Sequence, residues 1–162
     1  MSASVDSLLA RLADAERRLS EHADGPLPSG LTDPDPGAEE RWEAGQVWAH
    51  LAEFPAFWLG QVRHVVARSD EQPVPFGRTK TDPDRLAAIE RDRHADPHAL
   101  LERVRIALAE LTDEMRRLPA DAWRVRGIHA RLGEMSVERI VEHFLVEHLE
   151  EHADQLDGLA TG

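Results

Sequence analysis

The sequence predicts an all-α fold, a four-helix bundle, from three observations. Four long segments carry apolar residues at intervals of three and four, the spacing that places side chains on one face of an α-helix. Stretches rich in proline, glycine and polar residues separate these segments. No run of alternating polar and apolar residues is long enough to indicate a sheet, and the sequence has no internal repeat.

The first two predicted helices span about residues 5–22 and 39–66. In the first, Val5 and four leucines fall on one side of the helix. Proline and glycine then crowd residues 25–37, which indicates a long connection. The second helix has an apolar line of six residues. These are Val47, Leu51, Phe54, Trp58, Val62 and Val65.

Two Asp-Pro pairs mark the starts of the next two helices, because aspartate is a favoured N-cap and proline is favoured at the first helical position. The pair at 82–83 follows a polar, proline-interrupted stretch and opens a short helix to about residue 91. The pair at 96–97 opens the third long helix, to residue 118, where Pro119 ends it.

The last predicted helix covers residues 136–157, with Ser136 as its N-cap and Gly158 as its stop. Gly127 and Gly133 interrupt the chain before it and indicate a loop. We expect residues 1–162 to form a single helical bundle domain, long enough to bury a substantial core. The long connections can cross the bundle, so a simple up-and-down order is not required.

Composition excludes several classes of function. A formal charge of −12 opposes binding to nucleic acid or to an anionic membrane surface. The absence of cysteine excludes disulfides, thiolate metal ligands and a cysteine nucleophile. The N-terminal leucines are spaced by charged residues, unlike a signal peptide, and no stretch approaches the roughly 20 apolar residues that span a bilayer. We therefore expect a cytoplasmic protein with a small-molecule substrate.

Three histidines are candidate metal ligands: His50, His148 and His152. The last two lie one helical turn apart on the apolar stripe of the last helix, so they can hold one divalent ion from one side. Nine histidines in 162 residues give about 0.5 such pairs by chance, so this spacing alone is weak. His50 adds weight, because it lies between Val47 and Phe54 on the apolar stripe of the second helix. Three neutral imidazoles supply the protein side of an open metal site.

The remaining histidines are expected to be structural or solvated. His143 lies about 140° around the helix from His148 and should face solvent. His129 can cap a loop over the mouth of the site or fix the turn before Gly133, and the structural role is favoured. Surface positions are expected for His22, His64, His94 and His98; Pro97 opens a helix between the last two, so their rings should not share a face.

Three motifs, taken in order, resemble the DinB/YfiT-like superfamily of small metal-binding four-helix bundles, and the resemblance covers most of the chain. They are Trp48-Ala49-His50-Leu51-Ala52-Glu53, then Trp123-Arg124-Val125-Arg126-Gly127-Ile128-His129 with Leu132-Gly133-Glu134-Met135-Ser136, and finally His148-x-x-x-His152-x-x-Gln155-Leu156. The resemblance implies an up-down-down-up bundle with one ion, often nickel or zinc, at one end. The family's ligands match His50 and the pair His148 and His152.

The same resemblance implies a function and an assembly. Characterised relatives include S-transferases and isomerases that use a low-molecular-weight thiol such as bacillithiol or mycothiol. A thiol S-transferase is therefore the leading expectation, together with a homodimer. Mycothiol-dependent maleylpyruvate isomerases carry a second C-terminal domain, whereas this chain ends ten residues after His152, so that particular activity is not expected.

The chemistry of such a site also follows from the residues. A bound divalent ion lowers the pKa of a coordinated water or thiol, and a chain without cysteine must receive any thiol from a substrate or cofactor. Metal-bound histidines usually donate their second N–H to an acceptor, and helical spacing makes Glu53, Glu151 and Gln155 the candidates. Arg124 and Arg126 can meet an acidic cofactor, although loop arginines are usually solvated. The four tryptophans are expected to be packing residues.

Two other functions stay open. A non-catalytic metal-binding or dimerisation bundle would keep the three histidines, with an interface on the first and third long helices. The stretch from His148 to His152 also fits H-x-x-E-H, the pattern of inverzincin peptidases, with Glu151 as general base. That family needs a further acidic ligand and a larger scaffold, so this metallohydrolase is the less favoured alternative.

Overall fold

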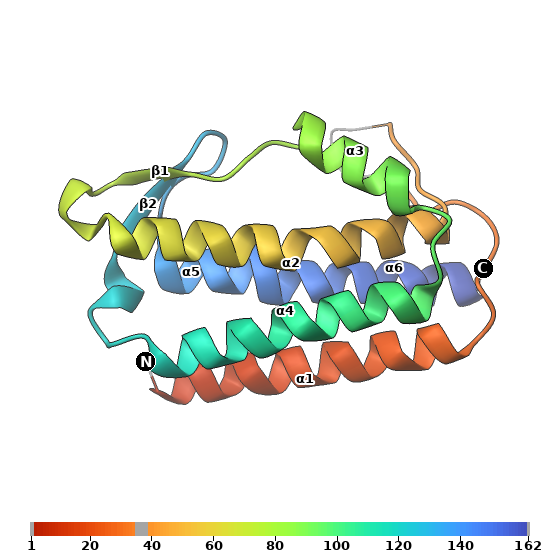
Figure 1. Ribbon diagram of the computed structural model, residues 1–162, viewed down its shortest axis with the longest axis horizontal. Coiled ribbons are helices and arrows are strands. Elements are labelled where there is room, and N and C mark those ends of the chain that lie inside the picture. The colour runs from red at the N-terminus through yellow and green to blue at the C-terminus, as the bar shows by residue number, and fades with distance from the viewer. Residues whose placement is uncertain (1, 35–38, 162) are drawn as a thin grey trace.

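The computed structural model describes residues 2–34 and 39–161. Its body consists of four long helical segments. In chain order they are α1 (Ser2–Asp24), α2 (Ala44–Ala67), α4 (Pro97–Arg117) and a last segment that joins α5 (Val137–Val141), the π-helical turn η3 (Glu142–Glu147) and α6 (His148–Thr161). Figure 1 shows α1 and the last segment running in one direction and α2 and α4 in the other. The predicted four-helix bundle with up-down-down-up order is confirmed.

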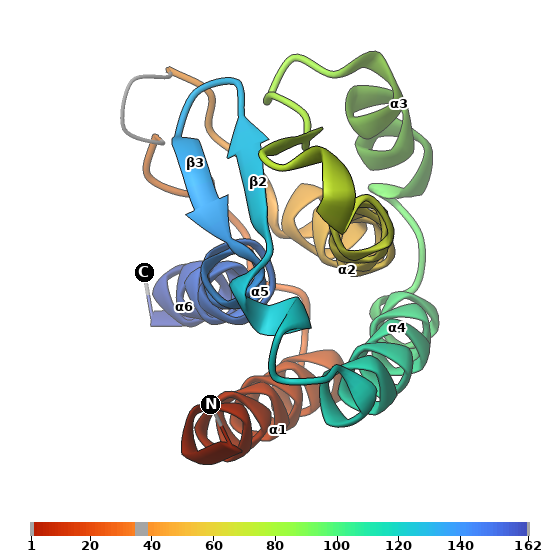
Figure 2. The same ribbon diagram turned by 90° about the vertical axis from the view of Figure 1, so that its left-hand side faces the viewer.

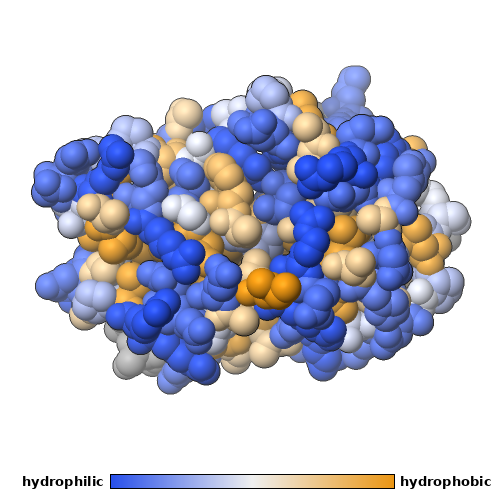
Figure 3. Space-filling view, in the orientation of Figure 1, coloured by the Kyte–Doolittle hydropathy of each residue, from blue (hydrophilic) through white to orange (hydrophobic). Residues whose placement is uncertain are grey.

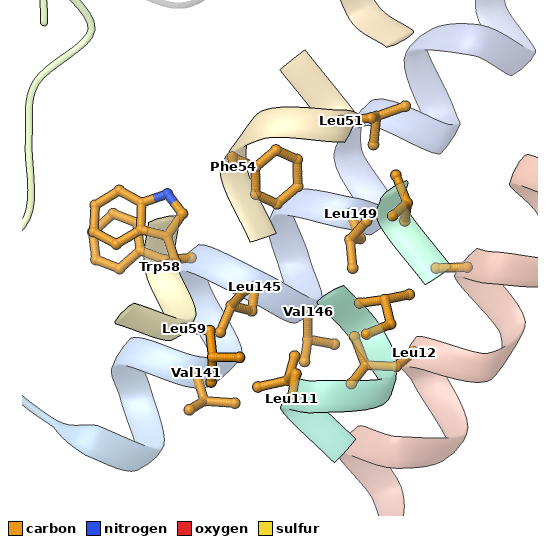
Figure 4. Close-up of a cluster of buried hydrophobic side chains, with 14 of the residues drawn as sticks. Leu12, Leu51, Phe54, Trp58, Leu59, Leu111, Val141, Leu145, Val146 and Leu149 are labelled. Atoms are coloured by element: carbon orange, nitrogen blue, oxygen red, sulfur yellow. The ribbon is translucent and has the colours of Figure 1, made fainter. Parts of the chain in front are cut away.

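The core lies where these four segments meet. Seen along the bundle, α1 packs beside α4 and α6, and α2 packs beside α4, α5 and α6 (Figure 2). Each segment contributes a leucine with at most 3% of its surface exposed: Leu12, Leu51, Leu111 and Leu145 (Figure 4). Each such burial stabilises the fold by about 1.5–3 kcal/mol relative to an exposed side chain. The apolar stripes of the sequence are therefore the faces that build the core.

The sequence predicts one continuous α-helix over 136–157, and this prediction is wrong in its middle. The π-helical turn η3 interrupts the helix there. Phe144, Leu145 and Val146 are consecutive and all buried. In an α-helix, three consecutive residues spread over about 200°, more than one apolar stripe covers. A π-helical turn holds more residues per turn and brings the three closer to one face. α6 begins directly after this turn, at His148.

Short elements cover one side of the bundle. They are η1 (Ser69–Glu71), β1 (Val74–Phe76), α3 (Pro83–Asp92), η2 (Ala122–Arg124), β2 (Arg126–His129) and β3 (Gly133–Ser136). β2 is the central strand of a small sheet, parallel to β1 and antiparallel to β3. The expectation that no sheet forms is wrong, because strands of three or four residues are too short to display an alternating pattern.

Gly127, which the sequence predicts in a loop, lies instead in β2. A glycine suits this position because β2 lies close to Phe76 of β1. It pairs with Val74 on one side and Met135 on the other. A Cβ atom at this position would lie 2.6 Å from Cδ1 of Phe76, so any larger residue would require the Phe76 ring to move.

Two predicted helix limits are wrong for local reasons. α2 begins at Ala44 rather than near residue 39, because the Gln46 side chain accepts a hydrogen bond from the N–H of Glu43 at 2.9 Å and caps the helix there. α6 continues through Gly158 to Thr161, whose hydroxyl donates to the Asp157 carbonyl at 3.1 Å. The other predicted limits of the long helices fall within three residues of the observed ones.

The connection predicted at 25–37 is partly described, and its residues 35–38 lie outside the described chain. Its two sides are joined near the bundle. The N–H of Thr32 donates to the Trp42 carbonyl at 2.8 Å, and the N–H of Trp42 donates to the Thr32 hydroxyl at 2.9 Å. This pair of bonds fixes Trp42 just before α2 begins.

The face of the molecule seen in Figure 1 is mostly hydrophilic, with apolar side chains in small separate groups (Figure 3). Arginines of α1 form ion pairs with acidic residues of the last segment, such as Arg11 with Glu142 and Arg18 with Asp154. Pairs as exposed as these contribute little to stability, about 0–1 kcal/mol each. Within residues 2–34 and 39–161, no helix has the length and apolar character needed to cross a membrane.

Candidate metal centre

The structure brings the three candidate ligands together, from two helices that are far apart in the sequence. His50 comes from the first half of α2, and His148 and His152 come from the start of α6. The Nε2 atoms of His50 and His148 lie 3.1 Å apart. One ring nitrogen from each of the three residues lies within 4.8 Å of the other two. The predicted convergence is therefore present, while metal binding itself stays a prediction.

The Nδ1 atom of each ring lies within hydrogen-bonding distance of an oxygen. His50 donates to the Glu53 carboxylate at 2.8 Å, His148 to the Phe144 carbonyl at 3.3 Å, and His152 to the Gln155 amide oxygen at 2.6 Å. Oxygens of these kinds accept, so the proton of each neutral ring sits on Nδ1. The lone pair of each ring is then on Nε2, which is the atom that a metal ion would need.

Two of the three predicted acceptors are found, and the third ring bonds to a backbone carbonyl. Glu53 and Gln155 bond to histidines as helical spacing predicted. The Nδ1 atom of His148 turns back to the backbone carbonyl of Phe144, four residues earlier. A backbone carbonyl has no signature in the sequence, so spacing of side chains alone could not identify it.

The donor set fits a tetrahedral metal ion. With Nδ1 protonated on both rings, the Nε2 atoms of His50 and His148 face each other with lone pairs and no hydrogen to share. Two lone pairs at 3.1 Å repel unless a cation lies between them. Nitrogen ligands at the usual zinc distance in a tetrahedral site lie about 3.3 Å from each other. The separation of these atoms is therefore close to what a shared ion requires.

Burial keeps the rings of His50 and His148 neutral. His50 and His152 are 2% and 7% exposed, whereas His148 is only partly buried. Desolvation holds the pKa of His50 well below its usual range, and the neighbouring His152 and His148 lower it further. Desolvation and His152 likewise hold the pKa of His148 well below its usual range, against the raising effect of the Phe144 carbonyl. Neutral imidazole is the form that binds metal, so these two rings need not lose a proton near pH 7.

Aromatic side chains enclose the three rings. Phe54 stacks on His148 with ring centroids 4.0 Å apart, and Trp42 stacks on His152 at 6.1 Å. Trp42 also meets His50 edge-on at 5.2 Å. The expectation that the tryptophans pack is confirmed, since Trp48, Trp58 and Trp123 are buried in the core and Trp42 is buried against the histidines. His148 is the one residue of the three that is not fully buried.

Two buried arginines, Arg78 and Arg85, lie next to the cluster and carry no signal in the sequence. Nη2 of Arg78 lies 2.6 Å from both carboxylate oxygens of Glu53. Arg85 is 7% exposed, donates to the Lys80 carbonyl at 2.8 Å and lies over the Trp42 ring. Burial raises the pKa of Glu53, and the hydrogen bond and charge of Arg78 oppose that rise.

The two arginines that the sequence offers as contacts of an acidic cofactor are not among the residues next to the histidines. Arg124 and Arg126 are exposed, and Arg126 pairs with Glu134 at 3.0 Å. No periodic pattern marks Arg78, because it lies in the irregular connection between β1 and α3. Only the fold brings that connection over α2.

His129 has the structural role that the sequence favoured. Its Nδ1 accepts hydrogen bonds from the backbone N–H groups of Arg131 and Leu132, at 3.2 and 3.3 Å. Its Nε2 therefore carries the proton and donates to the Arg78 carbonyl at 3.2 Å. The ring fixes the β2–β3 turn and attaches it to the segment that carries Arg78. His143, outside the cluster, is half-buried and bonds to Glu147 at 3.1 Å.

Gly77→Ala is expected to destabilise the fold by about 1–3 kcal/mol, because Gly77 has a φ of +94° and a Cβ there would lie 2.5 Å from Cδ2 of His129. Gly60→Ala is the matched control, since Gly60 lies in the exposed part of α2 with nothing within 4 Å of an added Cβ. That change should stabilise α2 by about 0.5–1 kcal/mol. Thermal unfolding of both variants checks the pair, and equal melting temperatures would contradict the strain assigned to position 77.

The family of the chain follows from comparison with known proteins. A family model described as the DinB superfamily matches residues 3–156. The chain belongs to the DinB superfamily. The expected resemblance is thereby confirmed. No curated protein is a significant match to this DinB-superfamily chain.

Solved structures of similar fold include YfiT from Bacillus subtilis, described as a probable metal-dependent hydrolase with an unusual four-helix bundle topology. It is 18% identical with a TM-score of 0.71, over 97% of this chain and 86% of that chain. The mycothiol-dependent maleylpyruvate isomerase is 17% identical with a TM-score of 0.66, over 94% of this chain and 60% of the isomerase. An uncharacterised protein from Clostridium difficile 630 is 10% identical with a TM-score of 0.65. At these identities the likeness shows a shared fold.

Proposed function

We propose that this DinB-superfamily protein is a divalent-metal-dependent enzyme that transfers a low-molecular-weight thiol of the mycothiol or bacillithiol type. His50, His148 and His152 would bind the ion, with zinc or nickel as the expected metal. The observation that carries the proposal is the common orientation of the three rings. Each has its Nδ1–H committed to an oxygen, so three Nε2 lone pairs remain for one cation.

The residues around the rings have two roles, enclosure of the cluster and access for a substrate. Phe54 and Trp42 exclude water from one side of the cluster and hold the rings by stacking. The partly buried His148 lies on the side that solvent and a substrate can reach. A bound zinc or nickel ion would supply a Lewis acid that lowers the pKa of a coordinated thiol or water. Since the chain has no cysteine, the thiol must come from a co-substrate.

Two alternative functions, a hydrolase and a non-catalytic bundle, would use the same site differently. If water rather than a thiol is activated, the enzyme is a hydrolase, the activity suggested for the neighbour YfiT. If no substrate reaches the ion, the protein is a metal-binding or dimerisation bundle; the expected homodimer stays a prediction. The H-x-x-E-H interpretation, with Glu151 as general base, stays less favoured, because such peptidases need a further acidic ligand and a larger scaffold than this helical bundle.

The test measures turnover by protein that is purified without chelator and without nickel-affinity chromatography. The protein is then loaded with zinc or nickel. We expect consumption of mycothiol or bacillithiol with an electrophilic acceptor. Removal of the metal with a chelator should lower the rate by about 100-fold or more, and added metal should restore it. Turnover without any thiol would favour the hydrolase, and tight metal binding with no turnover by any thiol would favour the non-catalytic bundle.

A further inference from the structure

A chain of contacts runs from an irregular surface segment to the innermost candidate ligand. Arg78 lies between β1 and α3, and its side chain is 8% exposed. A single nitrogen, Nη2, contacts both oxygens of Glu53 at 2.6 Å, and Glu53 accepts the Nδ1–H of His50 at 2.8 Å. Glu53 is itself only 7% exposed, so neither charged group of this pair is in bulk water. The guanidinium also lies over the Phe57 ring, 4.0 Å from its centroid.

The backbone that carries Arg78 is held at two points. The N–H of Gly77 donates to the side-chain oxygen of Gln61 on α2, at 2.7 Å. The carbonyl of Arg78 accepts from Nε2 of His129, at 3.2 Å. Because the ring of His129 also fixes the β2–β3 turn, the small sheet and α2 together determine where the guanidinium lies.

This arrangement restrains the orientation of Glu53. A glutamate has three rotatable bonds, and a hydrogen bond from His50 alone would restrain one oxygen. The contact of Nη2 with both oxygens restrains the whole carboxylate. With the carboxylate fixed, the His50 ring has a fixed rotation, and its Nε2 points toward the Nε2 of His148.

We propose that Arg78 is a positioning residue of the metal centre, which acts through Glu53 to orient the His50 ligand. This inference rests on the proposed function only in requiring that the three histidines bind an ion. It assigns a role to the small sheet as well, because the sheet holds Arg78 over α2 through His129. The alternative is that Arg78 has a purely structural role, in which it attaches the irregular segment to α2 and does not affect metal affinity.

Cobalt(II) is the probe that separates these roles, because its visible absorption reports ligand geometry whereas zinc is spectroscopically silent. Arg78→Met should weaken cobalt binding by about 10–100-fold and change the visible spectrum, since outer residues of this kind have effects of that size. Arg78→Lys should lose less affinity than Arg78→Met, because an ammonium can replace the single nitrogen that contacts Glu53 but not the planar contact with the Phe57 ring. Arg63→Met is the matched control: Arg63 pairs with Glu114 away from the cluster and should leave affinity and spectrum unchanged.

A double-mutant cycle with Glu53→Gln tests the route of the effect. If Arg78 acts through Glu53, the double variant should bind cobalt as weakly as Glu53→Gln alone. Affinities are measured well below the melting temperature of each metal-free variant, so that a loss of stability does not enter. Wild-type affinity and spectrum in Arg78→Met, or losses that multiply in the double variant, would overturn the positioning role. A wild-type protein that takes up no cobalt would instead overturn the proposed metal site itself.

Discussion

His50→Ala is expected to weaken zinc or nickel binding by more than about 100-fold. Loss of an outer hydrogen-bond partner alone costs metal sites about 10–100-fold in affinity, and removal of a ligand costs more. His50 is the only one of the three rings that comes from α2, so the remaining pair would hold the ion from α6 alone. Competition against a coloured chelator measures the dissociation constant directly.

The matched control for this variant is His64→Ala. His64 also lies on α2, near its end, where its ring bonds to the Pro75 carbonyl at 3.2 Å. Its loss should leave metal affinity unchanged. If both alanine variants bind metal as the wild type does, the three-histidine site is wrong; if both lose it equally, the effect comes from damage to α2 rather than from loss of a ligand.

The second large effect is expected in the core. Leu145→Ala should destabilise the fold by about 2–5 kcal/mol, because Leu145 is fully buried where the last segment meets α2 (Figure 4). For a chain of this length, that loss lowers the melting temperature by about 5–15 °C. Ile106→Ala is the control: Ile106 is 55% exposed on α4, and its truncation should change stability by less than about 0.5 kcal/mol. Comparable losses in the two variants would contradict the core as described.

The long helices could be predicted because their stabilisation comes from apolar stripes that the sequence displays. Leu12, Leu51 and Leu111 fall on those stripes and are buried. The small sheet could not be predicted, because its strands are held by backbone hydrogen bonds between segments far apart in sequence, and Gly127 marks a close approach rather than a turn. The end of α6 was missed because Gly158, although unfavourable inside a helix, does not by itself end one.

The histidines of the site could be predicted for the same reason as the core, since His50, His148 and His152 lie on apolar stripes. Their side-chain acceptors Glu53 and Gln155 also follow from helical spacing. The residues that come from irregular chain could not be predicted. Arg78 reaches Glu53 only because the connection after β1 crosses α2, and Trp42 covers the rings only because α2 begins later than its composition suggested.

The most direct test is X-ray absorption at the metal edge of zinc-loaded protein. The three-histidine site predicts three imidazole nitrogens at about 2.0–2.1 Å from a single zinc ion, with a remaining position for a light atom or a thiol. A zinc ion with one imidazole or none in its first shell would contradict it, because the rings of His50, His148 and His152 would then converge for packing alone.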